Sequence, residues 1–459
     1  MNMLNTIDLT ILGPGIDMNL KELLIWALRR GQTKAMIRRM ADCESQLEKF
    51  NAMWKDAVEN VSFYAEWKVK YGLPDQIDDL KELQGWPILE KKDLILNREK
   101  LTRKGVAKFH ESVTGGATGE PLHFRTMAGE SDQVAVNKWI GWARMGIYPD
   151  SRCFLLWGHR HFYGQGFASN IRFKFRQLKD WMTNNFRADA TDLSPAALRK
   201  DYELMLKFQP ECIIAYSASL LALVRTVRDD KIHCSPSPST FALLKAVICT
   251  AGPLTKEERG EISSFFGVPV AMEYGSMEAG VMAYQTPMTE GRYSVFEQTH
   301  ILHAIPEPVT GNSQVLVTKL YDCYLPLIRY KIGDYISGET VSEADLITGF
   351  DEVYGRTGDE VDMGNGIRFH GQSFMTCAEG FDQIVAYQIR VNKPMGKVVF
   401  VAQTIAQLLS EEKAEIVKRA AHMSGLAEGS ISVEEAKELV KAPSGKIRLV
   451  IEETGHFNV

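Results

Sequence analysis

The stretch CIIAYSASLLALVRTVRD at residues 212–229 decides the fold class of this chain. Residues 212–216 form a short apolar run that is typical of a strand buried on both faces, and residues 217–229 are predicted as a helix. Strands that alternate with helices predict a mostly parallel sheet covered by helices, which binds ligands beyond the carboxyl ends of its strands. The same succession recurs nearby, with strands predicted at 153–157, 246–250 and 268–272 and helices at 133–145, 194–208 and 255–266.

The pattern of predicted helices and strands changes along the chain and predicts two domains. The large domain covers residues 1–354, with a mainly helical lead-in over residues 1–100 and a β-rich unit from about residue 293. Residues 355–459 are predicted as a small α+β domain, which is long enough to fold as a unit. The β-rich unit has predicted strands at 315–318 and 325–330, and the small domain has strands at 384–391, 397–403, 431–434 and 447–452 and a helix at 410–423.

The composition narrows the class of protein. The chain has 459 residues, of which 45% are hydrophobic and 24% charged, as expected for a globular protein of two or three domains. The net charge of −5 gives no sign of the basic surface that nucleic acid requires. There is no signal-peptide pattern, and no uncharged apolar run reaches the roughly 20 residues of a membrane helix. The seven scattered cysteines fit reduced thiols, so we expect a cytoplasmic protein without nucleic-acid or membrane partners.

A glycine-rich stretch, SVTGGATGEP at residues 112–121, is the first candidate functional motif. Its three glycines and three hydroxyl residues could turn backbone N–H groups and hydroxyls toward a phosphate. It is not a Walker loop, because Glu120 stands five residues after Gly115 and no lysine follows. A flexible surface loop is the alternative interpretation of this stretch taken alone.

Five further segments are predicted at strand ends or in loops. Taken singly, each is explained by an ordinary turn or cap, because Gly, Asp and Ser are common turn residues. Their order along the chain is what carries information. The segments are TAGPL at 250–254, EYGSME at 273–278, IRYKIGD at 328–334, GRTGD at 355–359 and SGK at 444–446.

In this order and spacing, the six motifs resemble those of the phenylacetate–CoA ligase family. The nearer members are the capsule-biosynthesis-type and coenzyme-synthetase-like branch of the adenylate-forming superfamily. The likeness runs from about residue 80 to 455, and LPLIRY at 325–330 resembles that family's Leu-Pro-Val-Ile-Arg-Tyr. The resemblance implies an α/β fold with a mobile C-terminal lid domain. It also implies activation of a carboxylic acid by ATP, release of pyrophosphate, and transfer of the acyl group to a thiol, either CoA or a carrier-protein thiol.

The resemblance also assigns roles in a reaction that must neutralise phosphate charge. Glu278 would ligate Mg²⁺, Asp334 would accept both ribose hydroxyls, and Lys446 would bridge the carboxylate and the α-phosphate. Arg356 would bind ribose or phosphate. The β- and γ-phosphates would lie on Thr114, Gly115, Gly116, Thr118 and Gly119, and the nucleotide would also contact Ala251, Gly252, Glu273, Tyr274, Gly275 and Ser276.

The acyl pocket is expected beside the segment WGHRHFYG at 157–164. The substrate-binding residues implied there are His159, Phe162, Tyr163 and Tyr216, together with Gly252, Tyr274 and Gly275. Three of these, Phe162, Tyr216 and Tyr274, favour an aromatic or flat carboxylate because their rings can stack.

The sequence departs from the family at three places. Many members carry Lys or Arg where Glu120 stands, and Gly358 replaces the first Asp of the common Gly-Arg-x-Asp-Asp hinge. The loop at 363–368 is also unusual. The acceptor could therefore be an amine or hydroxyl, and a non-catalytic nucleotide- or acyl-binding relative is a further alternative. The helical N-terminal segment would suit a dimer contact.

Overall fold

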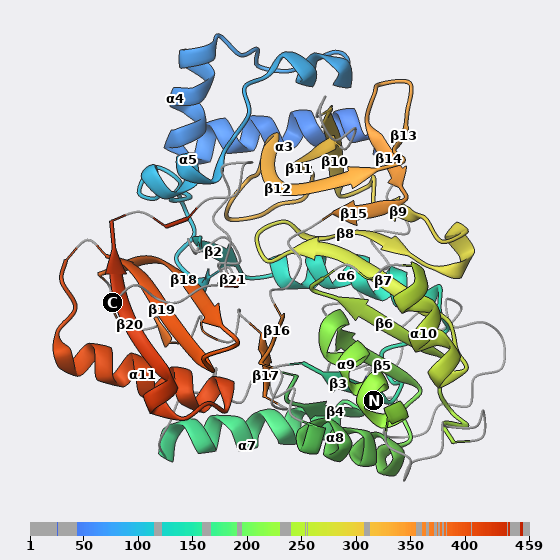
Figure 1. Cartoon of the computed structure of the whole chain (residues 1–459). Coiled ribbons are helices and arrows are strands. Elements are labelled where there is room, and N and C mark those ends of the chain that lie inside the picture. Colours follow the sequence, from blue (N-terminus) through green and yellow to red (C-terminus); the bar gives the residue numbers. More distant parts are fainter. Residues whose placement is uncertain are drawn as a thin grey trace, which may run out of the picture.

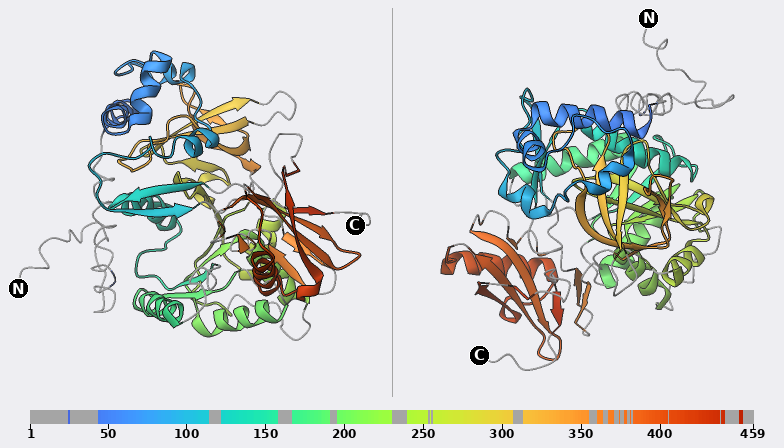
Figure 2. Two further views of the ribbon diagram at one scale, coloured as in Figure 1. Left: turned by 90° about the vertical axis from the view of Figure 1, so that its left-hand side faces the viewer. Right: turned by 90° about the horizontal axis from the view of Figure 1, so that it is seen from above.

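The structure is a computed structural model, and Figures 1 and 2 show its arrangement. All structural statements concern the residues that it describes. These are residue 25 and residues 44–113, 122–157, 167–190, 195–229, 240–252, 254, 256–306, 313–354, 360–363, 367–370, 374, 377–378, 381, 383–404, 406–437, 439–440 and 450–452.

A nine-stranded sheet forms the centre of the large part of the chain, as Figure 1 shows. Its order is β13-β14-β9-β8-β7-β6-β5-β3-β4, and the five strands from β7 to β4 are parallel. The parallel strands are β3 (Cys153–Leu156), β4 (Asn185–Ala188), β5 (Cys212–Tyr216), β6 (Ala246–Thr250) and β7 (Val270–Ser276). The antiparallel remainder is β8 (Gly280–Gln285), β9 (Tyr293–Val295), β13 (Thr340–Val341) and β14 (Ile347–Phe350).

Helices cover both faces of this sheet, which explains why its central strands are apolar throughout. Ile213 and Ala215 of β5 belong to the cluster that α8, α9 and α10 complete, whereas Cys212 and Ile214 pack in a second cluster with Trp139 of α6. The helices are α6 (Glu130–Ala143), α7 (Phe167–Met182), α8 (Pro195–Phe208), α9 (Ser217–Asp229) and α10 (Lys256–Phe266). The predicted α/β class with helix-covered sheets is confirmed; the large sheet itself is mixed, parallel from β7 to β4 and antiparallel from β7 to β13.

Helix α7 lies beside the edge strand β4 and has an unusual surface. Its Asp180 is buried and pairs with Arg187 of β4 at 3.1 Å. On the outer side, Ile171, Phe175, Leu178 and Trp181 are exposed, by as much as 68% for the tryptophan ring. Successive positions along this series are three or four residues apart, so the side chains form one stripe along the helix.

The β-rich unit is a four-stranded antiparallel sheet on which the helical lead-in packs (Figure 1). The prediction of a strand over residues 325–330 is wrong, because β12 begins only at Tyr330. Pro326 lacks a backbone donor, and Arg329 has a φ of 47°, which extended backbone does not allow. The strands are β10 (His300–Pro306), β11 (Ser313–Lys319), β12 (Tyr330–Ser337) and β15 (Glu352–Tyr354), and the lead-in elements are α3 (Gln46–Asn60), α4 (Ser62–Tyr71), η2 (Leu80–Gly85) and α5 (Lys91–Leu96).

A short antiparallel hairpin, β1 (Phe109–Val113) and β2 (His123–Met127), links the lead-in to α6. Val113 pairs with His123 at the loop end of the hairpin. The residues between them, 114–121, form the predicted phosphate loop and lie outside the described part of the chain.

The C-terminal elements have a hydrophobic cluster of their own and lie beside the rest of the molecule in Figure 2. Their sheet order is β20-β19-β18-β21, in which β18 and β19 form an antiparallel hairpin. The last strand is described only from Val450, later than the predicted residue 447. The elements are β18 (Ile384–Asn392), β19 (Lys397–Thr404), α11 (Ser410–Ser424), η6 (Glu428–Ser430), β20 (Ile431–Ala436) and β21 (Val450–Glu452), preceded by β16 (Glu360–Asp362) and β17 (Arg368–His370).

The described helices include none with both the length and the apolar character needed to cross a bilayer.

Candidate functional site

The candidate site lies at the carboxyl ends of β5, β6 and β7, where parallel α/β sheets bind ligands. Tyr216 ends β5 and pairs in register with Thr250, which ends β6. The segment 273–276, predicted to follow its strand, instead forms the last four residues of β7, which runs to Ser276. Two of the predicted motifs, TAGPL and EYGSME, thus meet Tyr216 at one edge of the sheet.

Glu273 is held by hydroxyl groups from two neighbouring strands. Its Oε1 accepts a hydrogen bond from Thr250 Oγ1 at 3.4 Å, and its Oε2 accepts one from the hydroxyl of Tyr284 on β8. The indole Nε1 of Trp142 donates to that same hydroxyl at 2.8 Å. Burial raises the pKa of Tyr284 well above its usual value, and the neighbouring Glu273 charge adds to the effect. This network fixes the ends of β6, β7 and β8 against α6.

Tyr274 connects the large sheet to the β-rich sheet. Its hydroxyl donates to Asp334 Oδ2 on β12 at 3.2 Å, and its ring packs edge-on against Phe350 with the centroids 5.6 Å apart. The tyrosine is buried and Asp334 is half-buried. The backbone enters Asp334 from Gly333, whose φ of 94° favours glycine. Two residues that are 60 positions apart in the sequence are therefore in direct contact.

Glu278 lies in the turn between β7 and β8 and is buried. The hydroxyl of Tyr330 lies 3.4 Å from Glu278 Oε1, and Lys319 Nζ donates to the Glu278 carbonyl at 3.2 Å. Within the described ranges, no three His, Cys, Asp or Glu side chains group as a metal-binding set. A single carboxylate of this kind fits Mg²⁺ that is carried mainly by substrate phosphates and water.

Ala251 and Gly252 turn the chain at the end of β6. Ala251 has a φ of 67°, a left-handed conformation that is uncommon outside glycine. Ser217 Oγ donates to the Gly252 carbonyl at 2.7 Å and so fixes the turn to the start of α9. Among the described residues other than its chain neighbours, no atom lies within 4 Å of a Cβ placed on Gly252, which leaves space over this backbone. That space is what a flat ring stacked against the peptide would require.

Gly275 is required by the close approach of two backbones. A Cβ at this position would lie 2.5 Å from the Gly280 carbonyl oxygen and 3.0 Å from Val281 Cα. The pairing of β7 with β8 shifts register at this point. Ser276 accepts the N–H of Ala279 at its hydroxyl at 3.1 Å, which closes the turn that carries Glu278.

Tyr216 and Trp157 form an aromatic pair at the ends of β5 and β3. Their ring centroids are 4.8 Å apart and the planes are inclined by 46°. Burial raises the pKa of Tyr216 to about 12, so the side chain is a neutral phenol at physiological pH. The pair forms an apolar wall with one polar tip.

The remaining predicted site residues lie outside the described part of the chain, and their roles stay predictions. The same applies to Glu120 and Gly358, the two departures from the family pattern. The residues concerned are Thr114, Gly115, Gly116, Thr118, Gly119, His159, Phe162, Tyr163, Arg356 and Lys446.

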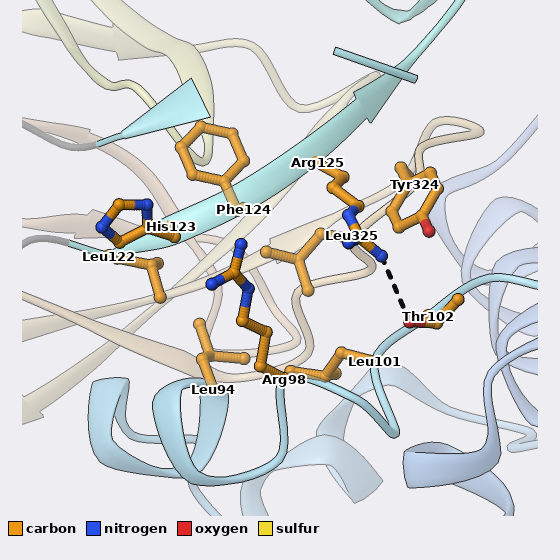
Figure 3. A pocket seen from close by; sticks show the side chains of 10 residues that line it. All are labelled: Leu94, Arg98, Leu101, Thr102, Leu122, His123, Phe124, Arg125, Tyr324 and Leu325. Atoms are coloured by element: carbon orange, nitrogen blue, oxygen red, sulfur yellow. Dashed lines mark hydrogen bonds between the residues drawn. The ribbon is translucent and has the colours of Figure 1, made fainter. Parts of the chain in front are cut away.

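A small pocket lies between α5 and the β1–β2 hairpin (Figure 3). Arg98 and Arg125 both pair with Glu111, at 3.5 and 3.3 Å, and Arg125 also lies over the ring of Phe109. Burial and the nearby Arg98 charge lower the pKa of His123. Glu111 offsets part of this charge, and the pocket adjoins the end of the hairpin next to the predicted phosphate loop. Its lining residues are Leu94, Arg98, Leu101, Thr102, Leu122, His123, Phe124, Arg125, Tyr324 and Leu325.

Sequence reasoning missed two charged residues behind the Glu278 turn. Lys319 ends β11, and Glu130 begins α6. A lysine at the end of the apolar run at 315–317 was the one available signal, and it is ambiguous because strand ends are often exposed. Tyr284 was missed because it lies within an ordinary-looking strand, β8.

Comparisons with known proteins support the fold. No protein-family model matches the chain. Protein CapK from Staphylococcus aureus is 26% identical over 311 residues, which cover 66% of this chain and 65% of CapK, so the match spans about two thirds of that relative. A 2-hydroxyisobutyryl-CoA ligase in complex with 2-HIB-AMP and CoA in the thioesterification state superposes with a TM-score of 0.57, at 14% identity and 89% coverage of both chains. An open conformation of that ligase gives a TM-score of 0.53, at 14% identity and 89% and 91% coverage.

Proposed function

We propose that this chain, which has the fold of the adenylate-forming superfamily and a distant relative in Protein CapK, activates a carboxylic acid with ATP. The products of the first step would be an acyl-adenylate and pyrophosphate. The acyl group would then pass to a thiol, for which we propose CoA. The protein is thus an AMP-forming acid–thiol ligase in this proposal.

The contact between Tyr274 and Asp334 carries the proposal. It brings the EYGSME segment at the end of β7 against the IRYKIGD segment of β12, which the motif order requires of a single nucleotide site. The open backbone at Gly252 lies at the end of the neighbouring strand and could receive the adenine. Asp334 retains acceptor capacity for ribose hydroxyls, because a carboxylate has two oxygens and several lone pairs.

The chemistry explains why these groups are needed. In the first step a carboxylate oxygen attacks the α-phosphorus, the bond to the bridging oxygen breaks, and pyrophosphate leaves. Two anions must approach, so cationic and N–H groups have to offset the charge that builds up. We assign this role to Lys446 and Arg356, and we assign the grip on the β- and γ-phosphates to residues 114–119.

Glu278 fits a site for Mg²⁺ that arrives with ATP. Its buried carboxylate would supply one oxygen ligand, and the phosphates would supply others. The ion, when bound, offsets phosphate charge. The protein's own contribution is to hold Glu278 in a closed turn, through Ser276 and through the side chains that bind the turn's carbonyls.

For the acid we propose an aromatic or flat carboxylate. Tyr216 and Trp157 supply ring surfaces at the strand ends where the acyl group is expected, and ring pairs favour planar ligands. The neutral phenol of Tyr216 adds a hydrogen-bonding group without charge.

We also propose a division into domains at residues 354 and 355. It is supported by the separate hydrophobic cluster of the C-terminal elements. Lys446 belongs to the second domain and is 112 positions from Asp334 in the sequence, so catalysis would require the two domains to meet.

The test is pyrophosphate release with Mg-ATP across a panel of aryl and short aliphatic acids, with and without CoA, with products identified by mass spectrometry. Acid-dependent pyrophosphate together with an acyl-CoA product is expected. Acyl-adenylate without thioester would replace CoA by another acceptor, such as a carrier-protein thiol or an amine. ATP binding with no release for any acid would favour a non-catalytic relative.

Two variants link this activity to the site. Asp334→Asn should raise the KM for ATP, and Lys446→Ala should abolish adenylation while ATP binding survives. Lys397→Ala is the matched control, because this exposed lysine begins β19 in the same C-terminal unit. An unchanged KM for ATP in Asp334→Asn together with undiminished adenylation in Lys446→Ala would overturn the residue assignment.

A further inference from the structure

Three buried side chains from the β-rich unit converge on two consecutive carbonyls of the turn that carries Glu278. Lys319 Nζ donates to the Glu278 carbonyl at 3.2 Å. The hydroxyl of Tyr321 and the Nε2–H of His300 both donate to the Ala279 carbonyl, at 3.1 and 2.8 Å. The turn is thus attached to the neighbouring sheet through its backbone, while the Glu278 carboxylate accepts a hydrogen bond from the Tyr330 hydroxyl and keeps further acceptor capacity.

The lysine in this set carries a charge into the interior. Lys319 is 1% exposed, and its ion-pair partner Glu130, at 3.4 Å, is 4% exposed. A buried ion pair commonly costs as much in desolvation as its attraction returns, and well-packed apolar residues would serve stability as well or better. Stability alone therefore does not account for a charged pair at this position.

Glu130 connects the pair to the hairpin that bears the glycine-rich loop. Its Oε2 accepts the backbone N–H of Met127, the last residue of β2, at 3.1 Å. The same oxygen accepts the N–H of Tyr324 at 3.1 Å. The other end of β2 is His123, two positions after residue 121, where the glycine-rich loop ends. One buried ion pair therefore joins the base of that hairpin to the Glu278 turn.

We infer that Lys319 and Glu130 are positioning residues that hold the Glu278 turn in a fixed relation to the phosphate-loop hairpin. The inference rests on the proposed function, because it assumes that Glu278 and the hairpin act on the same Mg-ATP. The pair does not contact the reacting atoms. It sets how far the carboxylate stands from the phosphates, and a small displacement there weakens metal binding without removing any ligand.

The double variant Lys319→Met/Glu130→Gln tests this inference. It removes both charges, and the glutamine carbonyl can still accept the N–H groups of Met127 and Tyr324. We expect the Mg²⁺ concentration at half-maximal pyrophosphate release to rise at least tenfold. The rate at saturating Mg²⁺ should stay within about threefold of wild type. A merely structural role would lower the melting temperature and the active fraction but would not change the Mg²⁺ requirement.

Gln388→Leu is the matched control. Gln388 is also buried and bonds to backbone groups of Val440, but it lies in the C-terminal sheet. Its Mg²⁺ requirement should equal that of wild type. If the double variant does not fold, Tyr321→Phe removes only the hydroxyl that bonds Ala279, and a threefold or larger rise in the Mg²⁺ requirement is expected.

Glu278→Gln, measured in parallel, separates the two proposals. Normal Mg²⁺-dependent activity in Glu278→Gln would overturn the metal-binding role on which the inference rests. Loss of activity in Glu278→Gln, with a wild-type Mg²⁺ requirement in the folded double variant or in Tyr321→Phe, would overturn the positioning role alone.

Discussion

Replacing Gly275 by alanine adds a single methyl group, yet it should lower the activity of the site strongly. The new Cβ would lie 2.5 Å from the Gly280 carbonyl oxygen, and the strands would have to separate by about 0.5 Å before that contact even reached 3.0 Å. The obstructing atoms belong to the backbone of β8 and cannot rotate away. The separation therefore moves the whole turn from Ser276 to Ala279, including the Glu278 backbone.

The magnitudes follow from this displacement. Overpacking of this kind costs about 1–3 kcal/mol. A chain of this size loses about 1 °C of melting temperature per kcal/mol, so a fall of about 1–3 °C is expected. Catalysis is more sensitive, because a misplacement of 1 Å can cost about 100-fold, and we expect pyrophosphate release to fall by roughly 10- to 100-fold.

The assay compares Gly275→Ala with Gly260→Ala by thermal unfolding and by acid-dependent pyrophosphate release. Gly260 lies on the exposed side of α10, and an added Cβ there meets no atom of the neighbouring described residues within 4 Å. Alanine should stabilise that helix by about 0.5–1 kcal/mol and leave activity unchanged. Wild-type activity and melting temperature in Gly275→Ala would show that the backbones can separate freely and would refute the reasoning.

Three further predictions concern stability and pH. Tyr284→Phe removes the hydroxyl shared by Trp142 and Glu273 and should cost about 1–3 kcal/mol in denaturant unfolding; a loss below about 0.5 kcal/mol would contradict the network. Burial, with an added effect of the Arg329 charge, lowers the pKa of His303 from 6.5 to about 4. The contribution of His303 to the free energy of unfolding is therefore present above pH 6.5 and lost as the pH falls through 4, by up to about 3 kcal/mol. His303→Leu should remove this dependence, so that the free energy of unfolding varies less with pH over this window. Because the pKa of Tyr216 is about 12, Tyr216→Phe should leave the alkaline limb of the pH–rate profile in place below pH 10, and a displaced limb would contradict the neutral phenol.

The sequence predicted most accurately those elements that begin and end where apolar residues give way to polar or helix-forming ones. Strands β5 and β6 and helix α9 begin and end at the predicted residues, because apolar runs there adjoin polar or helix-forming ones. Strand β4 was missed because its sequence, NFRA, is polar at two of four positions, as an edge strand allows. The error at 325–330 arose because an apolar run was taken for a strand, although Pro326 and the left-handed Arg329 prevent one.

The candidate site was only partly predictable for a different reason. Motif order singled out Tyr274, Asp334 and Glu278 as candidates; the structure shows the first two in contact, and the roles of all three stay predictions. The links to Lys319 and Glu130 depend on which backbone groups face each other after folding, and nothing local in the sequence encodes that pairing. Contacts between side chains and backbone carbonyls that are distant in the sequence therefore become known only from the structure.

The apolar stripe on α7 has a practical consequence for studying this protein. Phe175, Leu178 and Trp181 are exposed in the folded chain. A dye whose fluorescence rises on contact with apolar surface should therefore bind the folded protein. Dye-based melting curves should start from a high fluorescence baseline and understate the transition. Trp181, at 68% exposure, should in turn be open to iodide quenching. The fluorescence of Trp181 therefore offers an intrinsic signal for any molecule that binds to α7.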